Sequence, residues 1–149
     1  MALEGKLTIE GKGQEGWRIH DCDYEFIKPY DNNYKPSANC KGGLINFMIL
    51  SDNKDDTFFH SWMFNTMEKH TGFFDFTIIK PKQGSNTTET KHKIVKFSNA
   101  YCLHLGEYFS NNNASPMYMR ITICAGIITF DEDENNVKFQ NNAIDDNPY

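Results

Sequence analysis

The sequence predicts a mainly β fold, a small antiparallel β-barrel of two packed sheets with one short α-helix. Residues 117–130 place apolar side chains at every second position, the pattern of a half-buried strand, because successive side chains point to opposite faces. Residues 44–50 and 73–80 are short runs rich in Ile, Leu and Phe, which favour strands. Between these runs, residues 55–72 carry apolar residues at helical spacing.

Three further strands are expected at residues 5–10, 17–27 and 91–109. In the second, the apolar alternation changes phase between Ile19 and Cys22, which predicts a β-bulge or a bend. The third is long for a strand, so we expect it to bend midway. Its apolar face is expected to comprise Val95, Phe97, Tyr101, Leu103, Leu105 and Phe109.

The helix is expected to begin at Asp55, Asp56 and Thr57. These side chains can accept hydrogen bonds from free backbone N–H groups, and negative charge suits the positive end of the helix dipole. Its apolar stripe is expected to comprise Phe59, Trp62, Met63, Thr66 and Met67. Gly72 is expected to end it, because glycine readily takes the left-handed conformation. A polar loop is expected at residues 81–90.

Composition limits the classes of function. A chain of 149 residues fits one domain, and a net charge of −5 with only two arginines argues against nucleic-acid binding, which needs clustered positive charge. No apolar run approaches the roughly 18–20 residues that span a membrane, so we expect no membrane insertion. The first residues lack the apolar core of a secretory signal. The four cysteines, irregularly spaced, are expected to be reduced thiols.

The barrel domain is expected to span residues 1–130. Residues 131–149 differ from it in being acidic and Asn-rich. Two alternatives remain open for this segment. It is either a solvated C-terminal tail or an edge extension of the sheet, in which Val137, Phe139 and Ile144 contribute to a short strand.

The sequence predicts no catalytic residue, no cofactor and no metal site. His20 with Cys22 and Cys102 with His104 offer the ligand types of a Cys2His2 zinc site, but their spacing matches no zinc-ligand loop. Ordinary cysteines and surface histidines are the favoured interpretation. The chain also lacks the Gly-x-Ser-x-Gly nucleophile motif and a Gly-rich phosphate loop. We therefore do not expect an enzyme.

The strands carry more apolar residues than one barrel core needs, which indicates an interface. The apolar residues opposite the core-facing set are Leu44, Met48, Leu50, Phe73 and Ile79. Large exposed apolar faces mark association sites, and a heterologous interface that closes produces a ring. We expect these five residues to take part in ring closure. Residues 28–43 form a long, turn-rich loop of the kind that is usually functional.

The order of these features resembles a known family. The residues that carry the resemblance are Tyr24, Phe26, Asp31, Lys35, Pro36, Ser37, Gly42, Gly43, Ile45, Asp55, Asp56, Phe59, Trp62, Met63, Phe97, Asn99, Ala100, Tyr101, Tyr108, Phe109, Pro116, Met117 and the strand from Ile121 to Ile128. Together they resemble the hemolysin-coregulated protein (Hcp) family, the tube subunit of type VI secretion systems, and its Bacteroidetes branch in particular. The resemblance covers about residues 3–130. Lys35 stands where the family often has Arg.

The resemblance implies a phage tail-tube-like barrel that closes into homohexameric rings. Stacked rings form a tube inside a contractile sheath, and contraction expels the tube with effector proteins in its lumen. The implied partners are other copies of the chain and the sheath, spike and effector proteins. The protein would be cytoplasmic when assembled and exported without a signal peptide. The polar loop at 81–90 and the segment after Phe130 depart from the family pattern, which leaves open a variant rather than the main tube subunit.

The long loop is the predicted contact between stacked rings. The residues assigned to it are Asp31, Lys35, Pro36, Ser37, Gly42 and Gly43. The alternative is a monomeric β-barrel that binds a small ligand or carbohydrate. Its stacking platform would comprise Trp17, Tyr30, Tyr34 and Tyr118. Oligomeric state separates the two.

Overall fold

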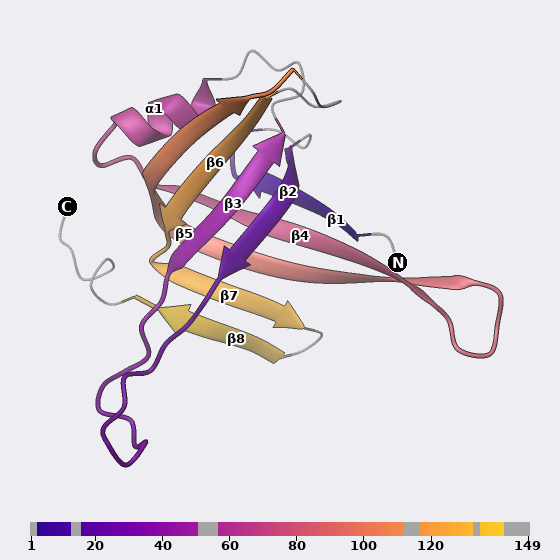
Figure 1. Ribbon diagram of the computed structural model, residues 1–149, viewed down its shortest axis with the longest axis horizontal. Helices are drawn as coiled ribbons and strands as arrows, with labels where there is room; N and C mark the ends of the chain where they lie inside the picture. Colours follow the sequence, from indigo (N-terminus) through magenta and orange to yellow (C-terminus); the bar gives the residue numbers. More distant parts are fainter. Residues whose placement is uncertain (1–2, 13–15, 51–56, 112–116, 133–134, 142–149) are drawn as a thin grey trace.

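The computed structural model describes residues 3–12, 16–50, 57–111, 117–132 and 135–141 of the chain. It contains eight strands and one helix in these residues (Figure 1). Their bounds are β1 (Leu3–Ile9), β2 (Trp17–Tyr24), β3 (Leu44–Leu50), α1 (Phe58–Phe64), β4 (His70–Pro81), β5 (Thr88–Phe109), β6 (Met117–Cys124), β7 (Ile127–Glu132) and β8 (Asn135–Gln140).

The strands form one antiparallel sheet that closes on itself. The strand order is β4-β1-β2-β3-β6-β5-β7-β8, and an additional pairing between β4 and β5 closes the ring of strands. In Figure 1, β2, β3 and β6 cross in front of β1, β4 and β7, so that two layers enclose the core. The predicted mainly β barrel with one short helix is therefore confirmed.

Strand β5 serves both layers. Its first part pairs with β4 and β7, and its second part, from Tyr101 onward, pairs with β6. Between them, Asn99 has φ = 54°, a left-handed conformation that is uncommon outside glycine but that Asn tolerates. The predicted bend in this long strand is confirmed.

The bend also shifts which side chains of β5 are buried. Val95 and Phe97 face the core before it, and Ala100 and Cys102 face the core after it. Leu103 is 51% exposed and Phe109 is 64% exposed, so the expectation that both lie on the buried face is wrong. The physical reason is that the left-handed conformation of Asn99 and the register shift between Cys102 and His104 each change the alternation of inward and outward side chains.

The barrel core is built by strand alternation. In β3, Ile45, Phe47 and Ile49 are buried while their neighbours are partly or fully exposed. The predicted bulge in β2 is confirmed, because the register with β3 shifts between Ile19 and Asp21. The largest fully buried side chains are Trp62, Phe59, Phe74, Phe97, Leu7, Ile9, Ile45, Ile49, Ile121, Ile123, Ile128 and Val95.

Helix α1 is shorter than predicted. It ends at Phe64, so Thr66 and Met67 lie beyond it, and Gly72 lies in β4 instead of ending the helix. A Cβ on Gly72 would lie 2.3 Å from the carbonyl oxygen of Thr8, so glycine is needed there for the close approach of β1. Thr57 occupies the N-cap position but makes no side-chain capping hydrogen bond. Asp55 and Asp56 lie outside the described residues.

The predicted single strand over 117–130 is two strands. It is interrupted at Ala125–Gly126, where Ala125 N–H donates to Gly43 O (2.8 Å) and Gly126 N–H donates to Ser98 O (3.0 Å). The alternation that starts at Met117 would place Ile127 inward, which is wrong, because beyond this break the buried residue is Ile128.

The segment after β7 continues the sheet. Strand β8 pairs with β7, and the Phe139 ring packs 5.0 Å from the Phe26 ring. Of the two alternatives for this segment, the edge strand holds for Val137 and Phe139, while Ile144 lies outside the described residues. The polar loop predicted at 81–90 is also shorter, because β4 includes Pro81 and β5 begins at Thr88. The division into a 1–130 domain and a separate extension stays a prediction.

Candidate assembly surfaces

The long loop between β2 and β3 is a projecting hairpin, which we call the β2–β3 hairpin (residues 27–41). Ile27 and Lys41 exchange backbone hydrogen bonds of 2.9 and 2.7 Å, and a second bridge joins Tyr30 to Pro36. The Asp31 carboxylate accepts the N–H groups of Asn33 (2.8 Å) and Lys35 (3.0 Å), which fixes the turn at the tip. Figure 1 shows this hairpin extending away from the barrel.

The hairpin tip carries two stacked aromatic rings. Tyr30 and Tyr34 have ring centroids 5.6 Å apart and are 65% and 82% exposed. Two aromatic rings that are held in a fixed position and are this exposed are suited to contact with another molecule. The sequence alone places both rings in the alternative ligand platform and not at this tip. Their spacing around Asp31, a turn-forming residue, was the available signal.

The residues predicted for this contact fall into two groups. Asp31, Lys35, Pro36 and Ser37 are exposed in the hairpin. The pair Gly42–Gly43 lies at its base, where a Cβ on Gly42 would lie 2.5 Å from the Phe26 ring and Gly43 is buried with φ = 104°. These glycines can orient the hairpin on the barrel, because only glycine fits such a position.

The five residues predicted for ring closure are not gathered in one patch. Leu44, Met48 and Leu50 lie on the outward face of β3, where Leu44 is 48% exposed. Phe73 and Ile79 are half-buried on β4, which β1 and β2 separate from β3 in the sheet. Their role in ring closure stays a prediction.

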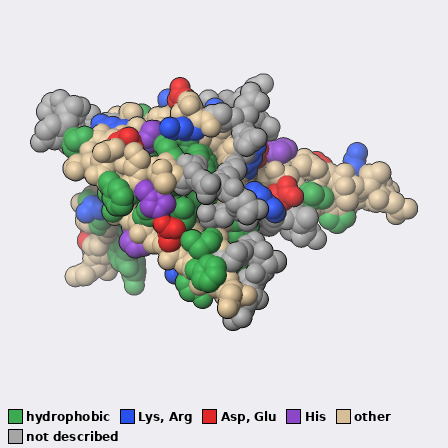
Figure 2. Space-filling model, turned by 90° about the horizontal axis from the view of Figure 1, so that it is seen from above, with side chains coloured by type: hydrophobic (Ala, Val, Ile, Leu, Met, Phe, Trp, Pro, Cys, Tyr) green, Lys and Arg blue, Asp and Glu red, His purple; other side chains and the backbone are tan. Residues whose placement is uncertain are grey.

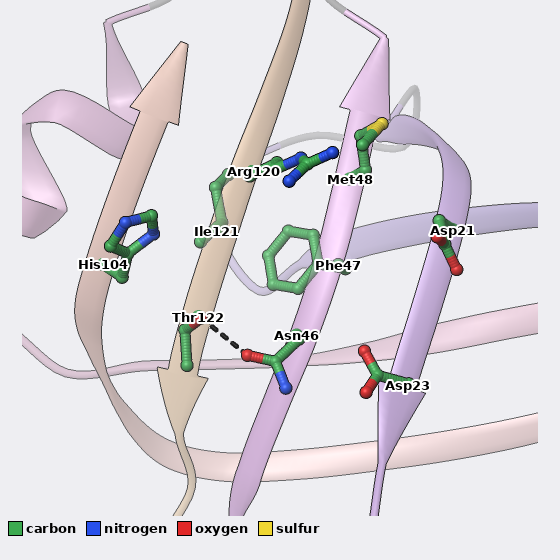
Figure 3. A pocket seen from close by; sticks show the side chains of 9 residues that line it. All are labelled: Asp21, Asp23, Asn46, Phe47, Met48, His104, Arg120, Ile121 and Thr122. Atoms are coloured by element: carbon green, nitrogen blue, oxygen red, sulfur yellow. Dashed lines mark hydrogen bonds between the residues drawn. The ribbon is translucent and has the colours of Figure 1, made fainter. Parts of the chain in front are cut away.

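The outward face of β2, β3, β6 and β5 is hollowed (Figure 3). One hollow of about 330 Å³ is lined by Asp21, Asp23, Asn46, Phe47, Met48, His104, Arg120, Ile121 and Thr122. Thr122 Oγ1 donates to Asn46 Oδ1 (2.7 Å) across β6 and β3. An adjoining hollow of about 500 Å³ adds Tyr108 and Tyr118.

This hollow does not have the geometry of a catalytic site. In Figure 3, Asp21 and Asp23 extend from β2, whereas His104 extends from β5 on the far side of β3 and β6. Three strand spacings of about 4.8 Å separate them, roughly 14 Å, so the imidazole and the carboxylates do not form a hydrogen-bonded acid–base pair. The face instead presents a shallow surface of mixed charge.

Each of the two candidate zinc-ligand pairs lies at a β-bulge. Cys22 packs against the core while His20 is exposed, and Cys102 is buried while His104 is exposed. The apolar face expected for residues 91–109 would place Cys102 on the opposite, outward face, and the burial of Cys102 shows that this is wrong. Among the described residues, no group of three His, Cys, Asp or Glu side chains is placed to hold a metal ion.

The buried thiols are poor nucleophiles. Burial, with smaller contributions from Asp23 and Asp21, raises the pKa of the Cys22 thiol to about 12. Burial also raises the pKa of the Cys102 thiol to about 11, against a backbone hydrogen bond to His104 that lowers it. Because the thiolate is the reactive form, these cysteines act as small apolar core residues.

The sheet of β2, β3, β6 and β5 has two open edges. Strand β1 pairs with β2 only at Trp17–Ile19, and within the described residues no strand pairs with that edge from His20 to Tyr24. On the opposite side of this sheet, the pairing of β4 with β5 ends at Ala100. Residues Tyr101–Phe109 therefore pair with β6 on one side and with no described strand on the other. Open edges of this kind accept another chain.

The four aromatic residues of the alternative ligand platform lie in three places. Trp17 packs on Phe58 and Phe59 of α1, with ring centroids 5.5 and 4.9 Å away. The two hairpin tyrosines lie at the tip described above, and Tyr118 lies near His20, 5.8 Å between centroids. The structure does not bring them together.

In the described residues, no helix is long and apolar enough to cross a membrane.

Comparison with known proteins matches this architecture. The structure of Hcp1 from Flavobacterium johnsoniae aligns with 27% identity and a TM-score of 0.69, covering 93% of this chain and 99% of that one. A mutant form of Hcp1 from the E. coli EAEC 042 pathovar has 10% identity and a TM-score of 0.67, covering 94% and 98%. The secreted protein Hcp3 from Pseudomonas aeruginosa has 12% identity and a TM-score of 0.63, covering 93% and 98%.

No curated protein sequence matches the chain. The family model described as hemolysin coregulated protein Hcp (TssD) matches residues 1–142. Together with the barrel, its single helix and the Bacteroidetes relative, this match shows that the chain belongs to the Hcp (TssD) family.

Proposed function

We propose that this protein is the structural tube subunit of a type VI secretion system, and that copies close into a hexameric ring through the open edges of the β2-β3-β6-β5 sheet. Membership of the Hcp family and the likeness to Hcp1 from Flavobacterium johnsoniae support the tube-protein role. The single observation that carries the ring is the pair of open edges, which are the unpaired stretch of β2 after Ile19 and the unpaired side of β5 after Ala100 in the described residues.

The two open edges are suited to pair with each other in different copies. Adjacent strands in β2-β3-β6-β5 are all antiparallel, so the first and fourth strands run in opposite directions. The β5 edge of one copy would therefore meet the β2 edge of the next as an antiparallel pair. Such a contact is heterologous, and it forms a closed ring when the rotation between copies closes.

In this ring the hollowed face lines the lumen. Asp21, Asp23, His104 and Arg120 would then present both signs of charge to effector proteins inside the tube. A polar surface without a large apolar centre is suited to reversible contact with such cargo. The sheath and spike proteins of the machine are the remaining partners of the proposal.

Rings would stack through the β2–β3 hairpin. Its narrow shape, its exposed residues Asp31 and Lys35, and the stacked pair of Tyr30 and Tyr34 support a contact with the next ring. The predicted set of Pro36, Ser37 and the glycines at the base remains part of this proposal as the framework of the hairpin.

The test is the mass of the purified chain in solution, followed by electron microscopy of the same material. Ring-shaped particles of several copies support the proposal, and a monomer at high concentration contradicts it. No specific observation favours the monomeric binding module, because its aromatic residues are dispersed.

A further inference from the structure

The end of the β4–β5 hairpin projects from the barrel. We call residues 79–92 the arm. Strand β1 stops pairing with β4 at Ile78, and β7 begins pairing with β5 only at Ile94, so within the described chain each arm strand has only the other as a partner. All side chains from Lys80 to His92 are exposed. Figure 1 shows the arm extending beyond the other strands.

Within the described residues, the barrel supplies no third strand to support the arm. A two-stranded hairpin alone is at best marginally stable in water. At its base, His92 Nδ1 lies 3.0 Å from Asp75 Oδ1 and 3.3 Å from Thr77 Oγ1, which braces the two strands but not the end. The arm is also basic on an acidic protein, with Lys80, Lys82 and Lys91 against Glu89, whereas the whole chain has a net charge of −5.

A complementary surface lies at the other end of β5. We call it the α1 patch: the exposed side chains of Phe64 and Phe109 beside the ion pair of His60 and Glu107. Phe64 is 76% exposed and contacts the His60 ring, with 6.5 Å between centroids. Figure 2, which views the molecule from above, shows hydrophobic side chains beside histidine and acidic side chains, and the arm projects at the right of the picture.

The arm cannot reach the α1 patch of its own molecule. Lys91 and Glu107 lie on the same strand, with roughly 50 Å of backbone between them at about 3.3 Å per residue, and Figure 1 shows the arm and α1 at opposite ends of the molecule. A contact between arm and patch must therefore join two copies head to tail, which is the arrangement that produces rings.

The arm and the patch also flank the two open edges of the sheet. Asp75 and Thr77 at the base of the arm line one hollow of about 500 Å³ together with Arg18 and His20 of β2, so the arm lies on the side of the β2 edge. Glu107 and Phe109 belong to the open part of β5, so the patch lies on the side of the other edge. A copy that pairs with the β2 edge brings its own patch to the arm.

We propose that the arm of one copy docks on the α1 patch of the next copy in the ring. The ammonium groups of the arm lysines would lie beside Glu107, and the methylene chains of these lysines would pack on Phe64 and Phe109. This inference rests on the proposed ring. The partner is a second copy because the arm lies beside the β2 edge and the patch lies beside the β5 edge that would pair with it. The basic arm would then meet the Glu107 carboxylate of the neighbouring copy.

Two variants test the docking by complementation. In the first, an Asn-Gly turn replaces residues 80–89, because Ile79 and Thr90 are register partners and a two-residue turn can join them. The second is Phe64→Ser with Phe109→Ser. Val137→Ser, which changes another exposed apolar side chain (63%), is the matched control. Circular dichroism verifies that each variant is folded.

Each variant alone should raise the concentration at which rings dissociate by at least about tenfold, the equivalent of 1.4 kcal/mol, while the control keeps the wild-type value. An equimolar mixture should form a two-copy species, because one intact arm meets one intact patch. Rings of wild-type stability in either variant overturn the docking and leave the tube proposal standing. A monomeric wild-type chain overturns both.

Cysteine cross-linking gives an independent readout. In a Cys40→Ser background, copies with Lys82→Cys are mixed with copies with Phe64→Cys and oxidised. A cross-linked pair is expected, and none is expected when Val137→Cys replaces Phe64→Cys. Equal cross-linking of both mixtures, or none in either mixture while rings are present, contradicts the docking.

Discussion

Trp62 on α1 donates its indole N–H to the backbone carbonyl of Ala100, 3.2 Å away, next to the bend of β5. The same N–H lies 3.2 Å from the carbonyl of Glu68. Trp62 is 1% exposed, so the helix is fixed to the barrel by a buried ring and its hydrogen bond at the point where β5 passes from one layer to the other.

Trp62→Phe keeps an aromatic ring but removes the donor. We expect the free energy of unfolding to fall by about 1–3 kcal/mol, because a buried acceptor loses its partner. Urea unfolding measures the change, with Ser61→Ala on the exposed side of the same helix as the control. Equal stability of the two variants contradicts the role of this bond.

Gly72→Ala places a methyl group 2.3 Å from the carbonyl oxygen of Thr8, so β1 and β4 must separate. We expect a loss of about 1–3 kcal/mol in the free energy of unfolding, as for other overpacked sites. In the matched variant Gly106→Ala, the nearest atom is 3.4 Å away, on the His104 side chain, so the loss should be much smaller. Denaturation of both proteins in parallel tests the contrast.

The raised thiol pKa values predict a loss of stability at alkaline pH. Folding holds Cys22 and Cys102 protonated up to a pKa of about 12 and about 11, against an ordinary value of 9.0. The folded state therefore binds more protons above pH 9, and the stabilisation present below pH 9 is lost as pH rises toward 11–12. The double variant Cys22→Ala, Cys102→Ala should show a shallower decline in unfolding free energy between pH 9 and 11. Parallel declines contradict the assignment.

Tyr30→Ser with Tyr34→Ser changes only the exposed tip of the β2–β3 hairpin. Ring mass should stay unchanged while stacking into tubes is lost, because the apolar contact between rings is removed. Shortening the hairpin between Asp31 and Asn39 should give the same result. Tube lengths in negative-stain images provide the measurement, and tubes of wild-type length contradict the stacking proposal.

A chain ending at Phe130 lacks β8 and the packing of Phe139 on Phe26. We expect the unfolding free energy to fall by about 1–3 kcal/mol from the lost aromatic contact and buried area. Rings should still close, because neither open edge of the sheet includes β8. Light scattering that shows only monomers would mean that this segment takes part in ring closure.

Local patterns predicted the parts of the fold that depend on neighbouring residues. The alternation of Ile45, Phe47 and Ile49 and the phase change at Ile19 follow from the two-residue period of a strand. The phase of β5 beyond Asn99 did not follow, because a left-handed residue reverses the alternation without a glycine to mark it. The end of α1 was also missed, since Thr66 and Met67 continue the helical spacing after the helix has ended.

The candidate surfaces were harder to predict than the strands. Composition identified the β2–β3 hairpin, because turn-forming residues cluster there. The ring-closure set joined residues of β3 and β4 that β1 and β2 separate, since a sequence does not give strand order. The open edges, the arm and the α1 patch depend on pairings between distant segments, so no local pattern indicates them.

Size-exclusion chromatography with light scattering, followed by negative-stain imaging of the same peak, shows whether the chain forms rings. We expect ring-shaped particles with about six times the chain mass of 17.3 kDa, as a head-to-tail interface that closes would give. A homogeneous monomer at high concentration, with the barrel folded, would contradict this expectation.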